Sequence, residues 1–107
     1  MSLFKSWLNR SFPDNTLFVM KVNYIIQHLD KYDKHKVFSH NAWQEKKESN
    51  VIYDLEKGRN PKHFKPVRLV LHKTRHKFRV EDGVSRLRAF KRRNISKIRV
   101  LLRIGEW

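Results

Sequence analysis

The chain has 107 residues, which suffices for one domain with a modest core, and 39% of them are hydrophobic, enough for the chain to fold. It contains no cysteine, which excludes disulfides, cysteine zinc sites and thiol nucleophiles. No apolar run is long enough for a transmembrane helix or a secretory signal, so we expect a cytoplasmic protein without a membrane partner.

Positive charge is concentrated in the second half of the chain. The whole sequence has 25 Lys and Arg against 10 Asp and Glu, a formal net charge of +15. Residues 1–53 carry 8 basic and 5 acidic side chains, a net +3, and residues 54–107 carry 17 and 5, a net +12. Because such an excess is costly in self-repulsion, it predicts a polyanionic partner, either DNA or another nucleic acid or a nucleotide. The alternative is a merely soluble basic protein.

We expect residues 1–15 to form an N-terminal arm and residues 16–107 to form a single domain. Within the arm, residues 2–8 suit a short amphipathic helix or a loose segment, and residues 12–15 are typical of a turn. The β-rich residues 16–22 predict a strand, and residues 23–29 predict a short helix capped by Asn23. Residues 30–38 are polar and show no period.

A longer helix is predicted from a cap at Ser39 or Asn41 to about residue 57. Residues at helical spacing predict one buried stripe on it, formed by Trp43, Lys47, Val51 and Leu55. Gly58 suits the end of this helix, and the Arg-Asn-Pro sequence that follows forbids its continuation.

The second half of the chain alternates clearly between strands and a helix. Residues 66–72 and 77–80 predict two strands of a hairpin, with Val67, Leu69 and Leu71 on one face. Residues 84–93 predict a helix that turns Val84, Leu87 and Phe90 to the core and Arg88, Lys91 and Arg92 outward. Asn94 suits a left-handed helix end, and residues 98–104 alternate as a last strand. This order predicts an α+β domain with a small mixed β-sheet flanked by helices.

The junction at Asp82-Gly83 is the most informative part of the sequence. A strand runs directly into this pair, and a helix begins at once. The N–H groups of Val84, Ser85 and Arg86 then have no partner within the helix and point outward at its positive end, which makes an anion site to which Arg86 adds a guanidinium. The alternative is that Asp82 is only a helix cap and Arg86 only a surface charge.

Three segments around this junction carry a family resemblance. They are KPVRLVL at residues 65–71, KFRVEDGVSRLRAFK at residues 77–91 and IRV at residues 98–100. Their order and spacing resemble the ParB/sulfiredoxin-like fold, whose members include partition proteins that bind CTP and DNA, ATP-using sulfiredoxins, free-serine kinases and putative nucleases. The resemblance implies that Asp82, Gly83 and Arg86 form the family's phosphate-binding turn.

The chain departs from the family at two positions of this turn. Val84 occupies the place of the sulfiredoxin cysteine, which excludes that activity. Val84 and Ser85 also replace the glutamate and arginine that partition proteins usually have. Together with the charge, the resemblance implies a stand-alone domain, in a phage or mobile-element setting, that binds nucleic acid or a nucleotide phosphate at Gly83, Val84, Ser85 and Arg86. The predicted nucleic-acid contacts are Arg88, Lys91, Arg92, Arg93, Lys97, Arg99 and Arg103.

Two other functions stay open. One is an enzyme, a metal-dependent nuclease or a phosphotransferase using ATP or CTP with Mg²⁺, in which Asp82 is catalytic. The other is a degenerate domain whose basic face binds an acidic protein.

Several weaker candidates have a simpler structural explanation. The spacing of His72 and His76 occurs in metal sites, but exposed histidines are the better interpretation, and we predict no metal site. Solvated surface charge is the better interpretation of four carboxylates, Asp30, Asp33, Glu45 and Glu48. Three tryptophans, Trp7, Trp43 and Trp107, are candidates for stacking on bases, although Trp43 is better explained as core.

Overall fold

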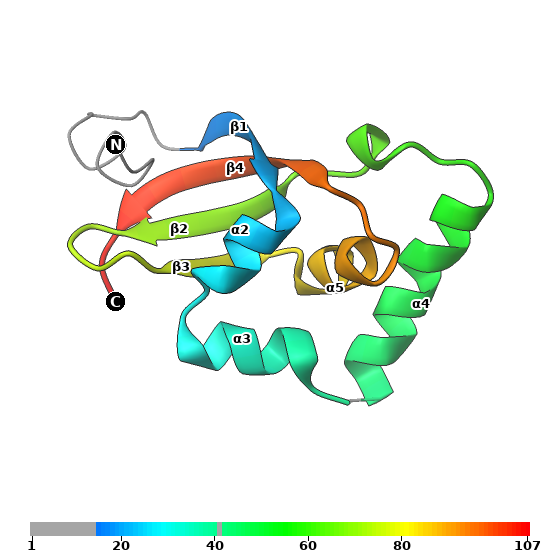
Figure 1. The fold of residues 1–107 in the computed structure, drawn as a ribbon, viewed down its shortest axis with the longest axis horizontal. Helices are drawn as coiled ribbons and strands as arrows, with labels where there is room; N and C mark the ends of the chain where they lie inside the picture. Colours follow the sequence, from blue (N-terminus) through cyan, green and yellow to red (C-terminus); the bar gives the residue numbers. More distant parts are fainter. Residues whose placement is uncertain (1–14, 41) are drawn as a thin grey trace.

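A computed structural model describes residues 15–40 and 42–107. Four strands form one sheet in the order β1-β4-β2-β3 (Figure 1). They are β1 (Thr16–Lys21), β2 (Val67–His72), β3 (Phe78–Asp82) and β4 (Lys97–Gly105). β1 and β4 are antiparallel, β4 and β2 are parallel, and β2 and β3 form the expected antiparallel hairpin. The sheet is therefore mixed, which confirms the predicted α+β class.

Four α-helices accompany the sheet, namely α2 (Val22–Gln27), α3 (Lys31–Phe38), α4 (Ala42–Glu56) and α5 (Val84–Arg92), together with a short 3-10 helix, η1 (Pro61–His63). Figure 1 shows α2 and α5 beside the sheet, α3 beyond them, and α4 alongside α5 at the far end from the β2–β3 hairpin. None of the described helices is long and apolar enough to cross a membrane.

Strand alternation fills the core from one face of the sheet. Every second side chain of β2 and β4 is buried at this face, as predicted, including Leu69, Val100 and Leu102 at 0% exposure. These side chains pack against Ile25 of α2 and Leu87 of α5, among others, in one cluster. The alternate residues of the same strands point to the opposite face.

The start of α2 and the whole of α3 differ from expectation. α2 follows β1 without a loop, and its N-cap is Lys21, so the predicted cap at Asn23 is wrong. α3 lies where no period was found, and its N-cap is Asp30, whose carboxylate accepts the N–H of Tyr32 at 3.1 Å. α3 was missed because it buries only Val37 and the carboxylate of Asp33, which do not make an apolar stripe.

Asp33 and the residues before it close one edge of the sheet. Along the outer edge of β3, the N–H of Phe78 donates to the carbonyl of His28 at 2.8 Å, and the N–H of Val80 donates to Oδ2 of Asp33 at 2.9 Å. Asp33 is fully buried, so its expected role as a solvated charge is wrong. Burial of this carboxylate is offset by Lys36 and Arg79, whose nitrogens lie 3.8 and 3.5 Å from its oxygens.

The buried side of α4 also differs from the predicted stripe. Trp43 is 61% exposed, Lys47 is exposed, and Val51 and Leu55 are only half-buried. Glu48 is buried instead, with 2% exposure, and it too is no solvated charge. The reason is that α4 packs along α5, where basic side chains pair with this carboxylate.

Two helix ends agree with the sequence. Gly58, after α4, has φ 94°, and Asn94, after α5, has φ 56°, both in the left-handed region that ends helices. The arm predicted over residues 1–15 lies outside the described residues except for Asn15, whose φ of 58° fits the predicted turn. Trp7 lies outside them as well.

Candidate phosphate-binding site

The junction between β3 and α5 has the predicted form. Gly83 is the N-cap of α5 with φ 111°, and its carbonyl accepts the N–H of Leu87 at 2.9 Å. A Cβ atom at Gly83 would lie 2.8 Å from Nη2 of Arg86 and 3.2 Å from Cγ2 of Val67. Glycine is favoured at this turn because side chains rarely adopt its backbone angle, and a Cβ would displace the Arg86 guanidinium. The first N–H groups of α5, from Val84 to Arg86, have no carbonyl partner within the helix.

Arg86 folds back over the turn instead of extending into solvent. Its Nη2 lies 3.1 Å from Oδ2 of Asp82 and 3.5 Å from the carbonyl oxygen of Pro66. The Arg86 side chain is only 16% exposed, whereas that of Asp82 is 64% exposed. Asp82 thus orients the guanidinium in this arrangement, and α5 is capped by Gly83 without a side-chain hydrogen bond. The alternative role of Asp82 as a helix cap is wrong.

The turn forms one wall of a cleft of about 460 Å³, and α4 forms the other. The hydroxyl of Ser85 donates to Oε1 of Gln44 at 3.1 Å, which links the two walls. Lys36 at the end of α3 and Lys47 of α4 line the same cleft as Gly83 and Arg86. We call this space, lined by Lys36, Trp43, Gln44, Lys47, Asn50, Val51, Val80, Glu81, Asp82, Gly83, Val84, Ser85 and Arg86, the anion cleft.

Beyond the predicted residues Asp82 to Arg86, the lining of the anion cleft includes two lysines and a tryptophan that the sequence did not assign to this site. Lys36 lies in the segment without a period, and Trp43 and Lys47 were assigned to the buried stripe of α4. Nζ of Lys47 lies 3.7 Å from the ring centroid of Trp43, and both residues face the cleft. A lysine in the middle of a supposedly apolar stripe was the one indication in the sequence that this side of α4 meets solvent.

The predicted nucleic-acid contacts do not form one surface. Arg88 is buried, and its side chain donates to Oε1 of Glu48 and to the carbonyl of Lys36, both at 2.7 Å. The expectation that Arg88 points outward is therefore wrong. Arg92 lies 2.8 Å from the same carboxylate.

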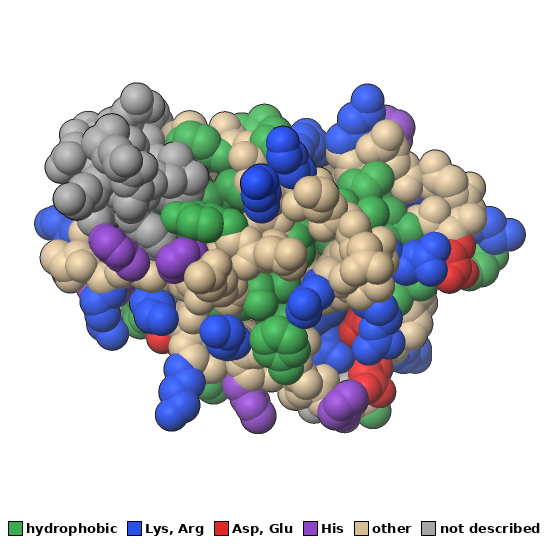
Figure 2. Space-filling model, viewed as in Figure 1, with side chains coloured by type: hydrophobic (Ala, Val, Ile, Leu, Met, Phe, Trp, Pro, Cys, Tyr) green, Lys and Arg blue, Asp and Glu red, His purple; other side chains and the backbone are tan. Residues whose placement is uncertain are grey.

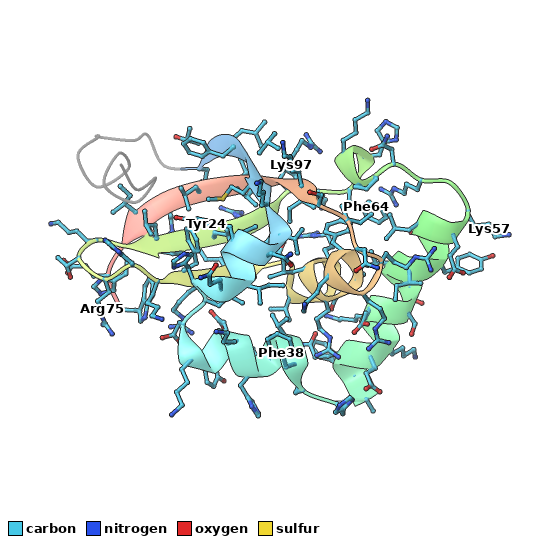
Figure 3. The ribbon with its side chains drawn as sticks, in the orientation of Figure 1. Tyr24, Phe38, Lys57, Phe64, Arg75 and Lys97 are labelled. Carbon is cyan, nitrogen blue, oxygen red and sulfur yellow. The ribbon has the colours of Figure 1, made fainter. Side chains whose placement is uncertain are left out.

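The remaining members of that set divide between the two faces of the sheet. Arg93, just after α5, pairs with Glu56 at 3.6 Å, and Lys91 of α5 lies 5.6 Å from the ring of Phe38, which Figure 3 places at the end of α3. Lys97, Arg99 and Arg103 belong to β4, where alternation turns them away from the helices. The structure therefore separates α5 from the basic residues of β4, although both are close in sequence.

His72 and His76 do not form a metal pair. His72 is 6% exposed, and its Nδ1 accepts the N–H groups of Thr74 at 3.1 Å and Arg75 at 3.0 Å. The expectation that His72 is exposed is wrong, because this ring organises the hairpin turn and packs against Trp107. Within the described part of the chain, no three side chains of His, Asp or Glu gather as a metal site would require.

Comparison with protein-family models, with curated proteins and with solved structures yields no match. The resemblance to the ParB/sulfiredoxin-like fold therefore stays a prediction from the sequence.

Proposed function

We propose that this chain is a nucleic-acid-binding module that holds a phosphate group of its ligand in the anion cleft. The observation that carries the proposal is the convergence of Lys36, Lys47 and Arg86 on one space with the positive end of α5. These groups come from three helices, so no single segment accounts for their proximity. Figure 2 shows Lys and Arg outnumbering Asp and Glu over the visible face, which favours a polyanion over a small neutral ligand.

Asp82 has a definite part in this proposal. Its carboxylate, which is 64% exposed, neutralises Arg86 while the cleft holds no phosphate, and solvent at the carboxylate weakens this ion pair. An incoming phosphate therefore replaces the carboxylate at Nη2 of Arg86 at little cost. Asp82 acts in this way as a positioning residue that keeps the guanidinium over Gly83. The resemblance to phosphate-binding turns of the ParB/sulfiredoxin-like family supports the same use of these positions.

A nucleotide such as ATP or CTP is the second candidate ligand, and Trp43 is the observation that favours it. The indole is 61% exposed and lines the cleft, whose volume of about 460 Å³ is in the range of small-molecule sites. A base stacked on Trp43 would leave its phosphates near Lys47 and Arg86.

The donors of the anion cleft fit phosphate oxygens better than they fit Mg²⁺. The two carboxylates in its lining are engaged by arginines, since Glu81 accepts from Nε of Arg103 at 2.6 Å and Asp82 accepts from Arg86. A nuclease or a phosphotransferase would need one of them released to act as metal ligand or base. Cleavage of the DNA that depends on Asp82 would show that this carboxylate is released for catalysis.

The test is fluorescence anisotropy with labelled DNA over a series of salt concentrations, on the whole chain and on Arg86→Gln. Arg59→Gln is the matched control, because Arg59 also forms an Arg–Asp pair, with Asp54 at 3.4 Å, but outside the cleft. Both variants lose one positive charge. We expect Arg86→Gln to lower the slope of log affinity against log salt by about 1, as the loss of one phosphate contact does, and Arg59→Gln to leave it unchanged.

Equal effects of the two variants would contradict a phosphate site at Arg86. Absence of DNA binding at about 150 mM salt would favour a nucleotide or an acidic protein as the partner, and a titration with ATP and CTP monitored by tryptophan fluorescence separates these two. Mg²⁺-dependent cleavage of the DNA that disappears in Asp82→Asn would show a nuclease.

A further inference from the structure

None of the described α-helices packs on the second face of the sheet, where Val70 is nevertheless buried, at 5% exposure. α2 and α5 pack on the core side, and alternation turns every second strand residue to the other side. Leu17 and Val19 of β1, on this second side, are 52% and 67% exposed. We call it the open face, and its outward residues include Leu17, Val19, Lys21, Arg68, Val70, Arg79, Lys97, Arg99, Leu101 and Arg103.

Strand pairing places cations of the open face in successive rows. Lys21 lies opposite Lys97, and Val19 opposite Arg99. The next row joins Leu17 and Leu101 to Arg68, and the following one joins Arg103 and Val70 to Arg79. Because rows on one face are two residues apart, successive rows lie about 7 Å apart along the strands.

Two of these cations are paired with carboxylates. Arg103 is bonded to Glu81, and Nε of Arg79 lies 3.5 Å from Oδ2 of Asp33. Arg68, Lys97 and Lys21 are exposed, and Arg99 uses Nη2 to bind the carbonyl of Phe64 while its Nε has no hydrogen bond to the described residues. A run of cations held this close by a rigid sheet repels itself, so the arrangement is complementary to a chain of anions at a similar repeat.

Two hollows flank the line of cations. One, of about 220 Å³, is lined by Val19, Pro61, Lys62, Lys97 and Arg99 and others of η1 and β4. The second, of about 260 Å³, is lined by residues that include Val70, Arg79, Arg103, Glu106 and Trp107. Figure 3 shows Lys97 where β4 begins and Arg75 at the hairpin tip, at opposite ends of the sheet, and the two hollows lie toward these ends.

We propose that the open face binds a single strand of nucleic acid, with backbone phosphates along Lys21, Lys97, Arg99, Arg68 and Arg103 and bases entering the flanking hollows. A single strand can turn its bases into such hollows, whereas a duplex keeps them paired and stacked. Leu17, Val19 and Leu101 supply apolar surface beside the phosphates. The proposal rests on the proposed function for the kind of ligand, but it uses residues outside the anion cleft.

The test compares two triple variants that each remove three positive charges. The face variant is Lys21→Gln, Arg68→Gln and Lys97→Gln, and the control variant is Lys31→Gln, Lys34→Gln and Lys46→Gln, all at exposed positions. Binding of a labelled single-stranded oligonucleotide of about 12 nucleotides is measured by anisotropy at several salt concentrations. We expect the face variant to lower the salt slope by about 2, since each single-strand phosphate contact contributes about 0.7, and the control variant to leave it unchanged.

Circular dichroism of both variants checks that each is folded. Equal losses in the two variants would show that only net charge matters and would overturn the proposal, as would an unchanged slope in the face variant. The assignment to a single strand would be overturned if a duplex of the same sequence bound as tightly as the single strand and if the face variant reduced the affinity for both equally. Arg86→Gln separates the two sites. If Arg86→Gln loses binding and the face variant does not, only the proposal for the open face is refuted. If the face variant loses binding and Arg86→Gln does not, only the proposal for the anion cleft is refuted.

Discussion

Replacement of Glu48 by leucine should destabilise the protein more than any change at an exposed charge. Glu48 of α4 is 2% exposed, and it accepts from Nε of Arg88 at 2.7 Å and lies 2.8 Å from Nε of Arg92. Arg88 is itself 3% exposed, so the variant Glu48→Leu leaves a guanidinium in the interior without a counter-charge. Figure 1 shows how α4 lies alongside α5, and this ion pair joins the two helices.

The size of the effect follows from the burial of both partners. Removing one member of a buried ion pair typically costs about 3–5 kcal/mol of unfolding free energy. We expect about 3 kcal/mol, at the lower end, because Arg88 keeps its bond to the carbonyl of Lys36. Arg92→Gln should cost only about 0–1 kcal/mol, since the Arg92 side chain is 60% exposed. The double variant Glu48→Leu/Arg88→Met removes both charges and should recover most of the loss.

Urea denaturation followed by circular dichroism measures these free energies on the wild type, the three single variants Glu48→Leu, Arg88→Met and Arg92→Gln, and the double variant. The reasoning is refuted if Glu48→Leu costs no more than Arg92→Gln. It is also refuted if the double variant is less stable than both Glu48→Leu and Arg88→Met, because the ion pair would then not be the reason for the loss.

Two further predictions concern a glycine and a histidine. Gly83→Ala should cost about 1–3 kcal/mol and should also weaken phosphate binding, because its Cβ would lie 2.8 Å from Nη2 of Arg86. Gly58→Ala is the control, because Gly58 has φ 94° and open space around it, so this variant carries the backbone strain alone. If Gly83→Ala costs no more than Gly58→Ala in urea denaturation and binds DNA as the wild type does, the close approach of Arg86 is contradicted. Burial first, and then the nearby charges of Lys77, His76 and Lys34, lower the pKa of His28 below its ordinary value of 6.5. Between the lowered pKa and 6.5, the unfolded chain therefore binds more protons at His28 than the folded chain does. The free energy of unfolding loses nothing from His28 above pH 6.5, and it decreases as the pH falls through that window. His28→Gln should therefore show a smaller loss of stability than the wild type between about pH 7 and pH 5, and NMR titration of His28 at or above 6.5 would contradict this.

Local patterns in the sequence determined much of the fold. The strands and the hairpin of the second half were predictable because alternation of two residues places one face in the core whatever the rest of the chain does. The turn at Gly83 and the end of α5 at Asn94 were predictable because a left-handed backbone restricts the residue type at a single position. The turn that we propose as a phosphate site could be located in the sequence for this reason.

Only the tertiary structure decided which charged side chains are buried. Asp33, Glu48 and Arg88 all looked like solvated surface charge, and each is buried because its partner comes from a distant segment, as Glu48 and Arg88 are 40 residues apart. The tertiary structure likewise brought together the cations of the anion cleft from three helices and turned the β4 cations away from α5. A charge can be buried only where a partner offsets its desolvation, and no spacing within one segment reveals a partner that another segment supplies.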